Sequence, residues 1–221
     1  MAERAQPQAV SGASRAAPPP WQVIRIVDVI VAATALLFLT PLMLAVAALV
    51  MLQDGGPPLF AQERIGRGAR IFRCYKFRSM VMDSQARLTD LLAKDPEIKM
   101  EWERDRKLRL DPRITFIGQF LRKSSIDELP QLFNILRGEM SVVGPRPIVR
   151  DEIQKYGRFF RYYTKVTPGL TGLWQVSGRN DIDYDRRVSI DVLYVRKRSL
   201  IFNIYIMVKT IPAVLARRGT Y

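Results

Sequence analysis

Histidine is absent from this chain of 221 residues, and cysteine occurs once, as Cys74. Without histidine there can be no Ser-His-Asp or Cys-His catalytic pair, no His-containing zinc site and no imidazole general base. The single cysteine excludes an intrachain disulfide and every CxxC metal or redox motif. Any chemistry must therefore use carboxylates, lysines, hydroxyls, backbone amides or a hard metal ion.

Acidic residues are also in short supply. The chain has 21 Asp and Glu against 35 Lys and Arg, which gives a net charge of +14 and a sequence pI near 10.3. An excess of this size indicates an anionic partner, which could be nucleic acid, an anionic membrane surface or a phosphorylated substrate. Composition alone does not choose among these three.

Charge is missing altogether from residues 29–52, a run of 24 almost entirely apolar residues. A straight helix of this length would reach about 36 Å, which exceeds the roughly 30 Å of a bilayer hydrocarbon core. A buried helix of a soluble protein is less favoured, because few soluble cores surround so long a helix on every side. The run therefore predicts contact with a membrane.

Pro41 lies in the middle of this run and predicts a kink or break, because it cannot donate to the carbonyl of Leu37. Each half would reach only about 18 Å and could not span a bilayer alone. Basic residues flank both ends, Arg25 before the run and four arginines from Arg64 to Arg73 after it. This pattern fits a helical hairpin that returns to the cytoplasmic face, and it equally fits a single kinked span.

Three regions follow from these features. Residues 1–21 are rich in Ala, Pro, Ser and Gln and predict a disordered tail, and residues 22–54 form the predicted re-entrant membrane helix. Residues 55–221 show no second linker or repeat and predict one compact domain with interfacial helices. The predicted fold class is α+β, mainly helical.

Within residues 55–221, called the body below, Ser84 to Leu108 predicts a long exposed helix. Phe116 to Leu136 predicts a second helix that ends at Gly138. Pro168 to Gly178 is typical of turns. Leu200 to Leu215 is apolar but too short and too interrupted to span, so it either packs on the body or lies at the membrane interface.

The segment Arg158 to Lys165 alternates aromatic rings with cations. This mixture suits the headgroup zone of a membrane, and it also suits nucleic acid through stacking and phosphate pairing. In a third interpretation the rings belong to the core and the cations face solvent.

Two adjacent carboxylates, Asp127 and Glu128, precede Pro130, a residue that fits the first turn of a helix. Acids at a helix N-terminus either cap the helix or sit where phosphate groups bind. In a chain without histidine, an Asp nucleophile beside a Glu that holds Mg²⁺ is one way to attack a phosphate ester. The spacing alone favours the capping role.

Two further segments suit phosphate. Arg146 stands between Pro145 and Pro147, where a rigid backbone favours bidentate pairing with phosphate oxygens. Pro168 to Arg179 offers glycine amides, hydroxyls and an arginine, although it matches neither the P-loop nor the dinucleotide-binding pattern.

Taken together, these segments resemble the bacterial sugar transferase family of membrane-associated polyprenyl-phosphate phosphoglycosyltransferases. The resemblance covers about residues 22–221 in the family's order and fits the short, single-domain form. The matching pieces are the apolar run with Pro41, Lys76 to Met80, Arg122 to Gly138, Met140 to Pro147, Pro168 to Arg179 and Thr210 to Tyr221.

The resemblance implies transfer of a sugar 1-phosphate from a UDP-sugar to polyprenyl (undecaprenyl) phosphate, with release of UMP. It implies that Asp127 is the nucleophile carrying a covalent phosphosugar and that Glu128 is its partner at Mg²⁺. The substrate-binding candidates that it implies are Lys76, Arg78, Arg122, Arg146, Gln175 and Arg179.

The family also implies that residues 55–221 are a cytoplasmic catalytic domain, at the cytoplasmic face of the bacterial inner membrane and among its lipids, with no role for nucleic acid. It favours the hairpin over the single span, and a homodimer remains open. One departure is that Arg198 and Asn203 stand where the family usually has Trp and Asp. The rival class is a non-catalytic, membrane-anchored binder of anionic lipid or nucleic acid.

Overall fold

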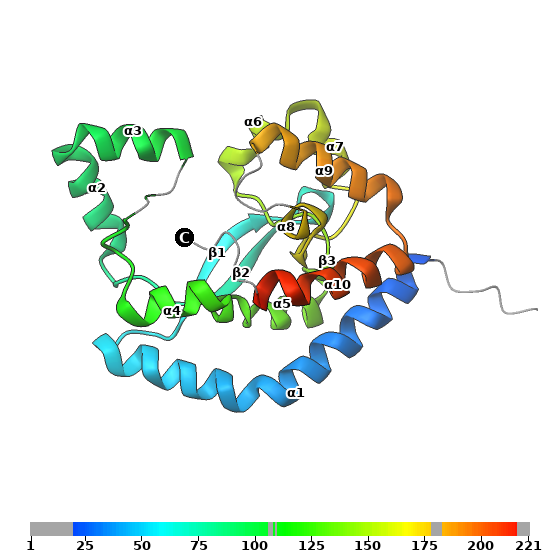
Figure 1. Cartoon of the computed structure of the whole chain (residues 1–221), viewed down its shortest axis with the longest axis horizontal. Coiled ribbons are helices and arrows are strands. Elements are labelled where there is room, and N and C mark those ends of the chain that lie inside the picture. The colour runs from blue at the N-terminus through cyan, green and yellow to red at the C-terminus, as the bar shows by residue number, and fades with distance from the viewer. Residues whose placement is uncertain (1–19, 106–107, 109, 178–182, 216–221) are drawn as a thin grey trace, which may run out of the picture.

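The computed structural model describes residues 20–105, 108, 110–177 and 183–215 (Figure 1). Its α-helices are α1 (Pro20–Asp54), α2 (Ser84–Lys94), α3 (Pro96–Asp105), α4 (Phe116–Ser124), α5 (Gln131–Arg137), α6 (Ile153–Tyr156), α7 (Phe160–Tyr163), α8 (Leu173–Val176), α9 (Tyr184–Lys197) and α10 (Leu200–Leu215). Its strands are β1 (Leu59–Ile65), β2 (Ile71–Phe77), β3 (Ser141–Val143) and β4 (Gly169–Thr171). The predicted fold class, mainly helical with some strand, is confirmed. The predicted disordered tail lies outside the described residues except for Pro20 and Trp21, which begin α1.

The long helix α1 continues through Pro41. Figure 1 shows it as one bent helix. Proline removes the hydrogen bond to Leu37, while the hydroxyl of the preceding Thr40 donates to the carbonyl of Leu36 at 2.6 Å and supports the same turn. Of the two outcomes predicted at Pro41, a kink or a break, the break does not occur: α1 bends but stays continuous, because neighbouring hydrogen bonds carry the helix past the proline.

One face of α1 packs on the body, and the opposite face is exposed. Ala32, Leu36 and Val46 are buried, whereas Phe38 is 74% exposed and Leu52 is 83% exposed. Within the described part of the chain, only α1 is long and apolar enough to cross a membrane. An apolar face of this extent fits a membrane anchor.

Both ends of α1 are bonded to the same body. At the start, Arg25 donates to the carbonyls of Ile135 and Leu136 in α5. Asp28, three residues later, accepts from the Ser141 hydroxyl at 2.7 Å and from the Val142 amide at 2.9 Å in β3. At the other end, Asp54 pairs with Arg78 just after β2. The apolar middle of α1 thus lies between two polar attachments to one body.

The two sheets each contain two strands. Strands β1 and β2 form an antiparallel hairpin that closes through η1 (Arg67–Ala69), where Gly68 has a φ of +67°. Strands β3 and β4 pair in parallel. Gly144 and Gly169 let them approach, since a Cβ on Gly169 would lie 2.0 Å from the Gly144 nitrogen. Sequence patterns had located none of these strands.

Both long helices predicted within the body are divided. The expected helix from Ser84 to Leu108 separates into α2 and α3, because Asp95 ends the first and caps the second by accepting from the amides of Glu97 and Ile98. The expected helix from Phe116 to Leu136 is broken at Ser125, which adopts a left-handed φ of +58°. The chain then forms the short 3₁₀ turn η2 (Ile126–Glu128) before α5 begins.

The aromatic and cationic segment divides between core and surface. Tyr163 is buried in a cluster with Tyr156 and Val188, while Arg158 and Arg161 are exposed. Figure 1 places α7 on the side of the body away from α1. This placement favours the structural interpretation over contact with headgroups. Helix α10 packs on α1, α8 and the β3–β4 pair.

Candidate active site

The acid pair is presented by the turn η2, between α4 and α5. Because Ser125 is left-handed, the chain reverses after α4, and the Glu128 amide donates to the Ser125 carbonyl at 3.2 Å. Asp127 becomes buried, with 8% of its surface exposed, while one third of the Glu128 side chain remains exposed. The two neighbours in sequence therefore occupy different environments.

Lys76 on β2 pairs with both acids. Its Nζ lies 2.6 Å from Oε1 of Glu128 and 3.8 Å from Oδ2 of Asp127. The strand is held in place by Asn134 of α5, which is fully buried. The side chain of Asn134 accepts from the Tyr75 amide at 3.0 Å and donates to the Arg73 carbonyl at 2.7 Å. Asn134 thus positions Lys76, a role that no sequence pattern had indicated.

The environment separates the pKa values of the two acids. Burial raises the pKa of Asp127 to about 6, and the negative charge of Glu128 adds to this effect, against the opposing charges of Lys76 and Arg122. Burial also acts on Glu128, but there the cations Lys76, Arg146 and Arg64 outweigh it, so the pKa of Glu128 is lowered. Glu128 is therefore a stable anion, and Asp127 is mostly ionised near neutral pH.

A pocket opens beside this acid pair, between the β1–β2 hairpin and the loops around β3 and β4. It is lined by Arg64, Cys74, Lys76, Glu128, Gln131, Arg146, Pro147, Gly169, Leu170 and Gln175. The structure therefore brings together four of the predicted site residues, namely Lys76, Glu128, Arg146 and Gln175, with Asp127 adjacent to Glu128.

Arg64 and Gln131 line the same pocket and were not predicted as site residues. The guanidinium of Arg64 donates to the carbonyl of Pro147 at 2.9 Å and lies 3.7 Å from Glu152, so it braces the loop that carries Arg146. The available signal was the acid-free run of arginines from Arg64 to Arg73, which had been assigned only to the flank of the membrane helix.

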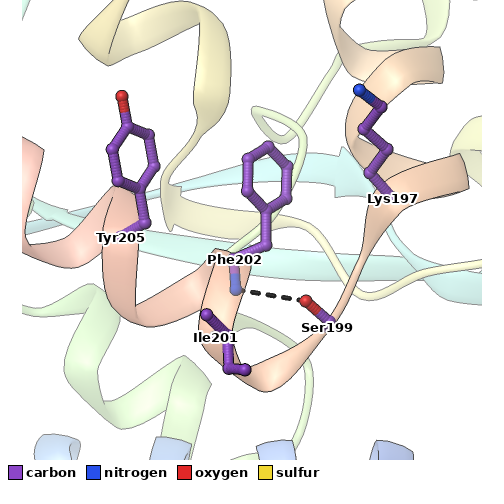
Figure 2. A pocket seen from close by; sticks show the side chains of 5 residues that line it. All are labelled: Lys197, Ser199, Ile201, Phe202 and Tyr205. Atoms are coloured by element: carbon purple, nitrogen blue, oxygen red, sulfur yellow. Dashed lines mark hydrogen bonds between the residues drawn. The ribbon is translucent and has the colours of Figure 1, made fainter.

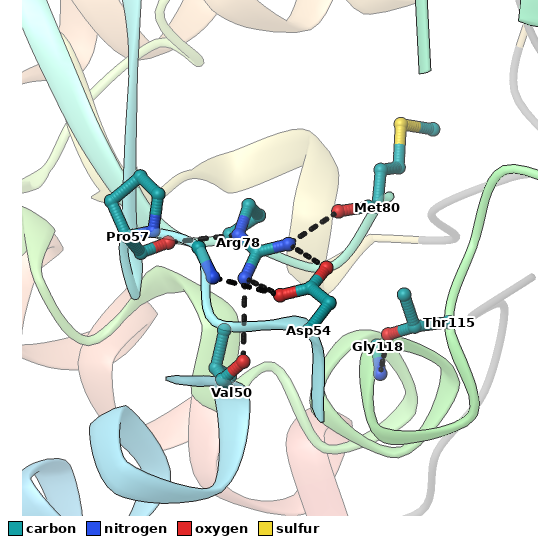
Figure 3. Close-up of polar contacts among 8 residues, drawn as sticks. Val50, Asp54, Pro57, Arg78, Met80, Thr115 and Gly118 are labelled. Carbon is teal, nitrogen blue, oxygen red and sulfur yellow. Dashed lines mark hydrogen bonds and ion pairs between the residues drawn. The ribbon is translucent and has the colours of Figure 1, made fainter. Parts of the chain in front are cut away.

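Two predicted residues, Arg78 and Arg122, do not line the pocket. Arg78 is 8% exposed, and its guanidinium pairs with Asp54 at the end of α1 and donates to the carbonyls of Val50 and Pro57 (Figure 3). Arg122 bonds to Ser79 and acts on Asp127 from outside the pocket lining. Arg179 lies outside the described residues.

A second, shallower pocket lies where α9 meets α10 and is lined by Lys197, Ser199, Ile201, Phe202 and Tyr205 (Figure 2). Its lining contains one cation and no carboxylate. The groups that could act on a phosphate ester therefore gather at the Lys76 pocket.

The family is decided by comparison with known proteins. A family model described as bacterial sugar transferase matches residues 20–217. The chain belongs to the bacterial sugar transferase family.

Relatives with assigned names support this membership. A Salmonella typhimurium protein named undecaprenyl-phosphate galactose phosphotransferase is 52% identical over 197 residues, which cover 89% of this chain and 41% of that protein. The exopolysaccharide production protein ExoY of Sinorhizobium fredii is 48% identical, covering 88% of this chain and 86% of its own. A Xanthomonas campestris protein named UDP-glucose:undecaprenyl-phosphate glucose-1-phosphate transferase is 39% identical, covering 88% of this chain and 39% of its own. The chain thus spans about two fifths of the Salmonella relative.

In this bacterial sugar transferase, the two departures from the family pattern lie away from the Lys76 pocket. Asn203 is buried, and its amide oxygen accepts from the Tyr194 hydroxyl at 3.0 Å. A neutral amide makes this bond without burying a charge. Arg198 lies near the same tyrosine. Neither residue lines the pocket that holds the acid pair.

The donor set suits one hard cation. Among the described residues, no three His, Cys, Asp or Glu side chains form a metal-binding group. Mg²⁺ usually keeps several waters and binds through one or two carboxylates plus substrate phosphates. Glu128, an ionised and partly exposed carboxylate in the pocket, fits that limited requirement.

Burial of Asp127 predicts a pH-dependent cost in stability. A pKa raised from 3.8 to about 6 means that the folded protein holds this proton more tightly than the unfolded chain. Ionised Asp127 therefore destabilises the fold above about pH 6, by about 3 kcal/mol at most, and the cost disappears as the pH falls toward 4. We expect Asp127→Asn to unfold at a higher temperature than the wild type at about pH 8, and at the same temperature near pH 4. Thermal unfolding with a chelator present measures both. A wild type that is the more stable protein at pH 8 would contradict the assignment.

Proposed function

We propose that this protein transfers a sugar 1-phosphate from a UDP-sugar to polyprenyl phosphate through a covalent phosphosugar on Asp127. In the first displacement, a carboxylate oxygen of Asp127 attacks the β-phosphorus, the bond to the bridging oxygen breaks, and UMP leaves with the electron pair. In the second, a phosphate oxygen of the lipid attacks the same phosphorus and releases the Asp127 carboxylate. The product is a polyprenyl diphosphate sugar, which would begin an exopolysaccharide, capsule, O-antigen or glycoprotein glycan.

The observation that carries this proposal is the placement of Asp127 beside Glu128 and Lys76 at a pocket with two arginines. An anionic nucleophile and an anionic phosphate repel each other, so the reaction needs cations that offset both charges. Lys76 lies within 4 Å of both acids, and Arg64 and Arg146 line the same pocket.

The proposed roles follow from these positions. Lys76 holds the Asp127 carboxylate and offsets its charge during attack. Arg146, on a loop stiffened by two prolines, binds the phosphates of the donor, and Arg64 keeps that loop in place through Pro147. Gln175 lines the pocket as a polar contact for the donor.

Mg²⁺ is the proposed cofactor, with Glu128 as its protein ligand. When bound, the cation would offset charge on the diphosphate and on the departing UMP. The low pKa of Glu128 keeps this ligand ionised without help from the metal.

The proposed location is the cytoplasmic face of the bacterial inner membrane, with α1 as a re-entrant anchor. Arg25 and Asp28 at one end of α1, and Asp54 at the other, all bond to the same body. A body that stays on one side of the membrane then requires both ends of α1 to stay there too. The bent, exposed apolar middle of α1 would enter the bilayer and return.

The rival function is a membrane-anchored binder of anionic lipid or nucleic acid that carries out no chemistry. It explains the basic composition and α1, but gives no role to a buried carboxylate whose ionised form costs stability. Substitution of Asp127 separates the two, because a binder would retain its affinity.

The catalytic assignment predicts specific losses of turnover. UDP-galactose is the first donor to test, because the relative named for galactose transfer is 52% identical and the one named for glucose transfer is 39% identical. In purified membranes supplied with polyprenyl phosphate and a panel of UDP-sugars, we expect UMP release from the wild type and at least a 1,000-fold loss, on the order of 4 kcal/mol, in Asp127→Asn. Glu128→Gln should lose activity together with its dependence on Mg²⁺ concentration. Near-normal UMP release by Asp127→Asn would show that Asp127 is not the nucleophile. An unchanged Mg²⁺ requirement in Glu128→Gln would show that Glu128 is not the metal ligand.

The re-entrant path predicts that the tail and the body share one compartment. Cys74→Ser removes the only native thiol, and Ser11→Cys then provides a single label in the tail. We expect this cysteine to resist a membrane-impermeant maleimide in intact cells and to react after lysis. A permeant maleimide, which should label it in both conditions, is the control. Labelling of intact cells by the impermeant reagent would indicate a helix that crosses the bilayer.

A further inference from the structure

The loop that follows β2 is fixed first by Arg78. Its guanidinium pairs with both carboxylate oxygens of Asp54 and donates to the carbonyls of Val50 at 3.3 Å and Pro57 at 2.8 Å (Figure 3). Two of these partners, Val50 and Asp54, belong to the last turn of α1. A buried arginine with this many acceptors fastens the loop to the end of the membrane helix.

Ser79, the next residue, is fixed against α4. Its carbonyl accepts from the Thr115 amide at 3.1 Å, and a Cβ on Gly118 would lie 2.0 Å from the Ser79 carbonyl oxygen. Ser79 is itself buried, with 8% of its surface exposed. The backbone that carries the Ser79 hydroxyl therefore has no room to shift relative to α4.

The hydroxyl of Ser79 leads to the nucleophile through one arginine. It accepts from Nε of Arg122 at 2.9 Å, and the positive charge of Arg122 acts on the Asp127 carboxylate. Neither Ser79 nor Arg122 is among the residues that line the pocket. Arg122 is thus a second cation that acts on Asp127, in addition to Lys76. The hydroxyl of Ser79 sets the direction of the Arg122 side chain.

We infer that Ser79 is a positioning residue for the transfer reaction: its hydroxyl holds Arg122 beside Asp127, from a loop that Arg78 fastens to the end of α1. The inference rests on the proposed function. Loss of this acceptor frees a long side chain to leave Asp127, because a guanidinium keeps one direction only while its hydrogen bonds fix it. The donor pocket itself stays intact, so the chemical step should weaken more than donor binding does.

The test compares Ser79→Ala with Ser79→Thr in the full chain, with UDP-sugar and polyprenyl phosphate as substrates. We expect Ser79→Ala to lower kcat for UMP release about tenfold while KM for the UDP-sugar stays within about twofold. Ser79→Thr keeps the hydroxyl and should recover at least about half of wild-type kcat. A double variant of Ser79→Ala with Arg122→Ala should be no slower than Arg122→Ala alone, since both remove the same contact.

Thr115→Ala is the matched control for simple damage to α4. Thr115 caps this helix by accepting from the Gly118 amide at 2.9 Å (Figure 3), whereas Arg122 donates to Ser79. Its loss should lower the unfolding temperature and leave kcat near the wild-type value. Wild-type kcat in Ser79→Ala, a loss matched by Thr115→Ala, or a double variant with multiplied losses would overturn the inference while leaving the proposed function in place. Absence of UMP release from the wild type with every UDP-sugar would overturn both.

Discussion

The pairing of Lys76 with the acids of η2 is the interaction on which the site depends. It joins the β1–β2 hairpin to the turn between α4 and α5, two parts of the chain that are 51 residues apart between Lys76 and Asp127. Burial alone would make an ionised Asp127 costly, and the nearby ammonium limits that cost. The same ammonium, with Arg146 and Arg64, keeps Glu128 ionised. Lys76 lowers the pKa of both carboxylates, but burial prevails at Asp127 and the added cations prevail at Glu128. The two adjacent acids therefore differ in acidity, as the proposed nucleophile and metal ligand require.

The membrane helix contributes to the same arrangement. Arg25 attaches the start of α1 to α5, the helix that follows the acid pair, and Asp54 attaches its end to the loop after Lys76. The elements that carry Lys76 and Asp127 are thus each tied to one end of α1. The proposed reaction, with one substrate in water and another in the bilayer, would benefit from such ties, because they fix the distance of the pocket from the membrane.

Sequence patterns and family resemblance located the acid pair, the partner lysine, the loops with Arg146 and Gln175, and the apolar anchor. These features are visible because each depends on local composition or on a short motif. The break at Ser125 was not predicted, since a left-handed serine leaves no signal in a run that otherwise favours a helix. The roles of Asn134 and Arg64 depend on contacts between distant segments, and so does the placement of Arg78. The family motif implied that Arg78 binds a substrate, whereas tertiary packing places the Asp54 carboxylate of α1 against its guanidinium.

The proposed covalent bond between Asp127 and the phosphosugar can be detected by mass spectrometry. The wild type would be incubated with UDP-galactose and Mg²⁺ without lipid acceptor, quenched in acid and digested. We expect the peptide containing Asp127 to gain the mass of one hexose phosphate, and we expect polyprenyl phosphate added before the quench to remove this gain. An unmodified Asp127 peptide in an enzyme that still releases UMP, or the added mass on a different residue, would contradict a covalent intermediate on Asp127.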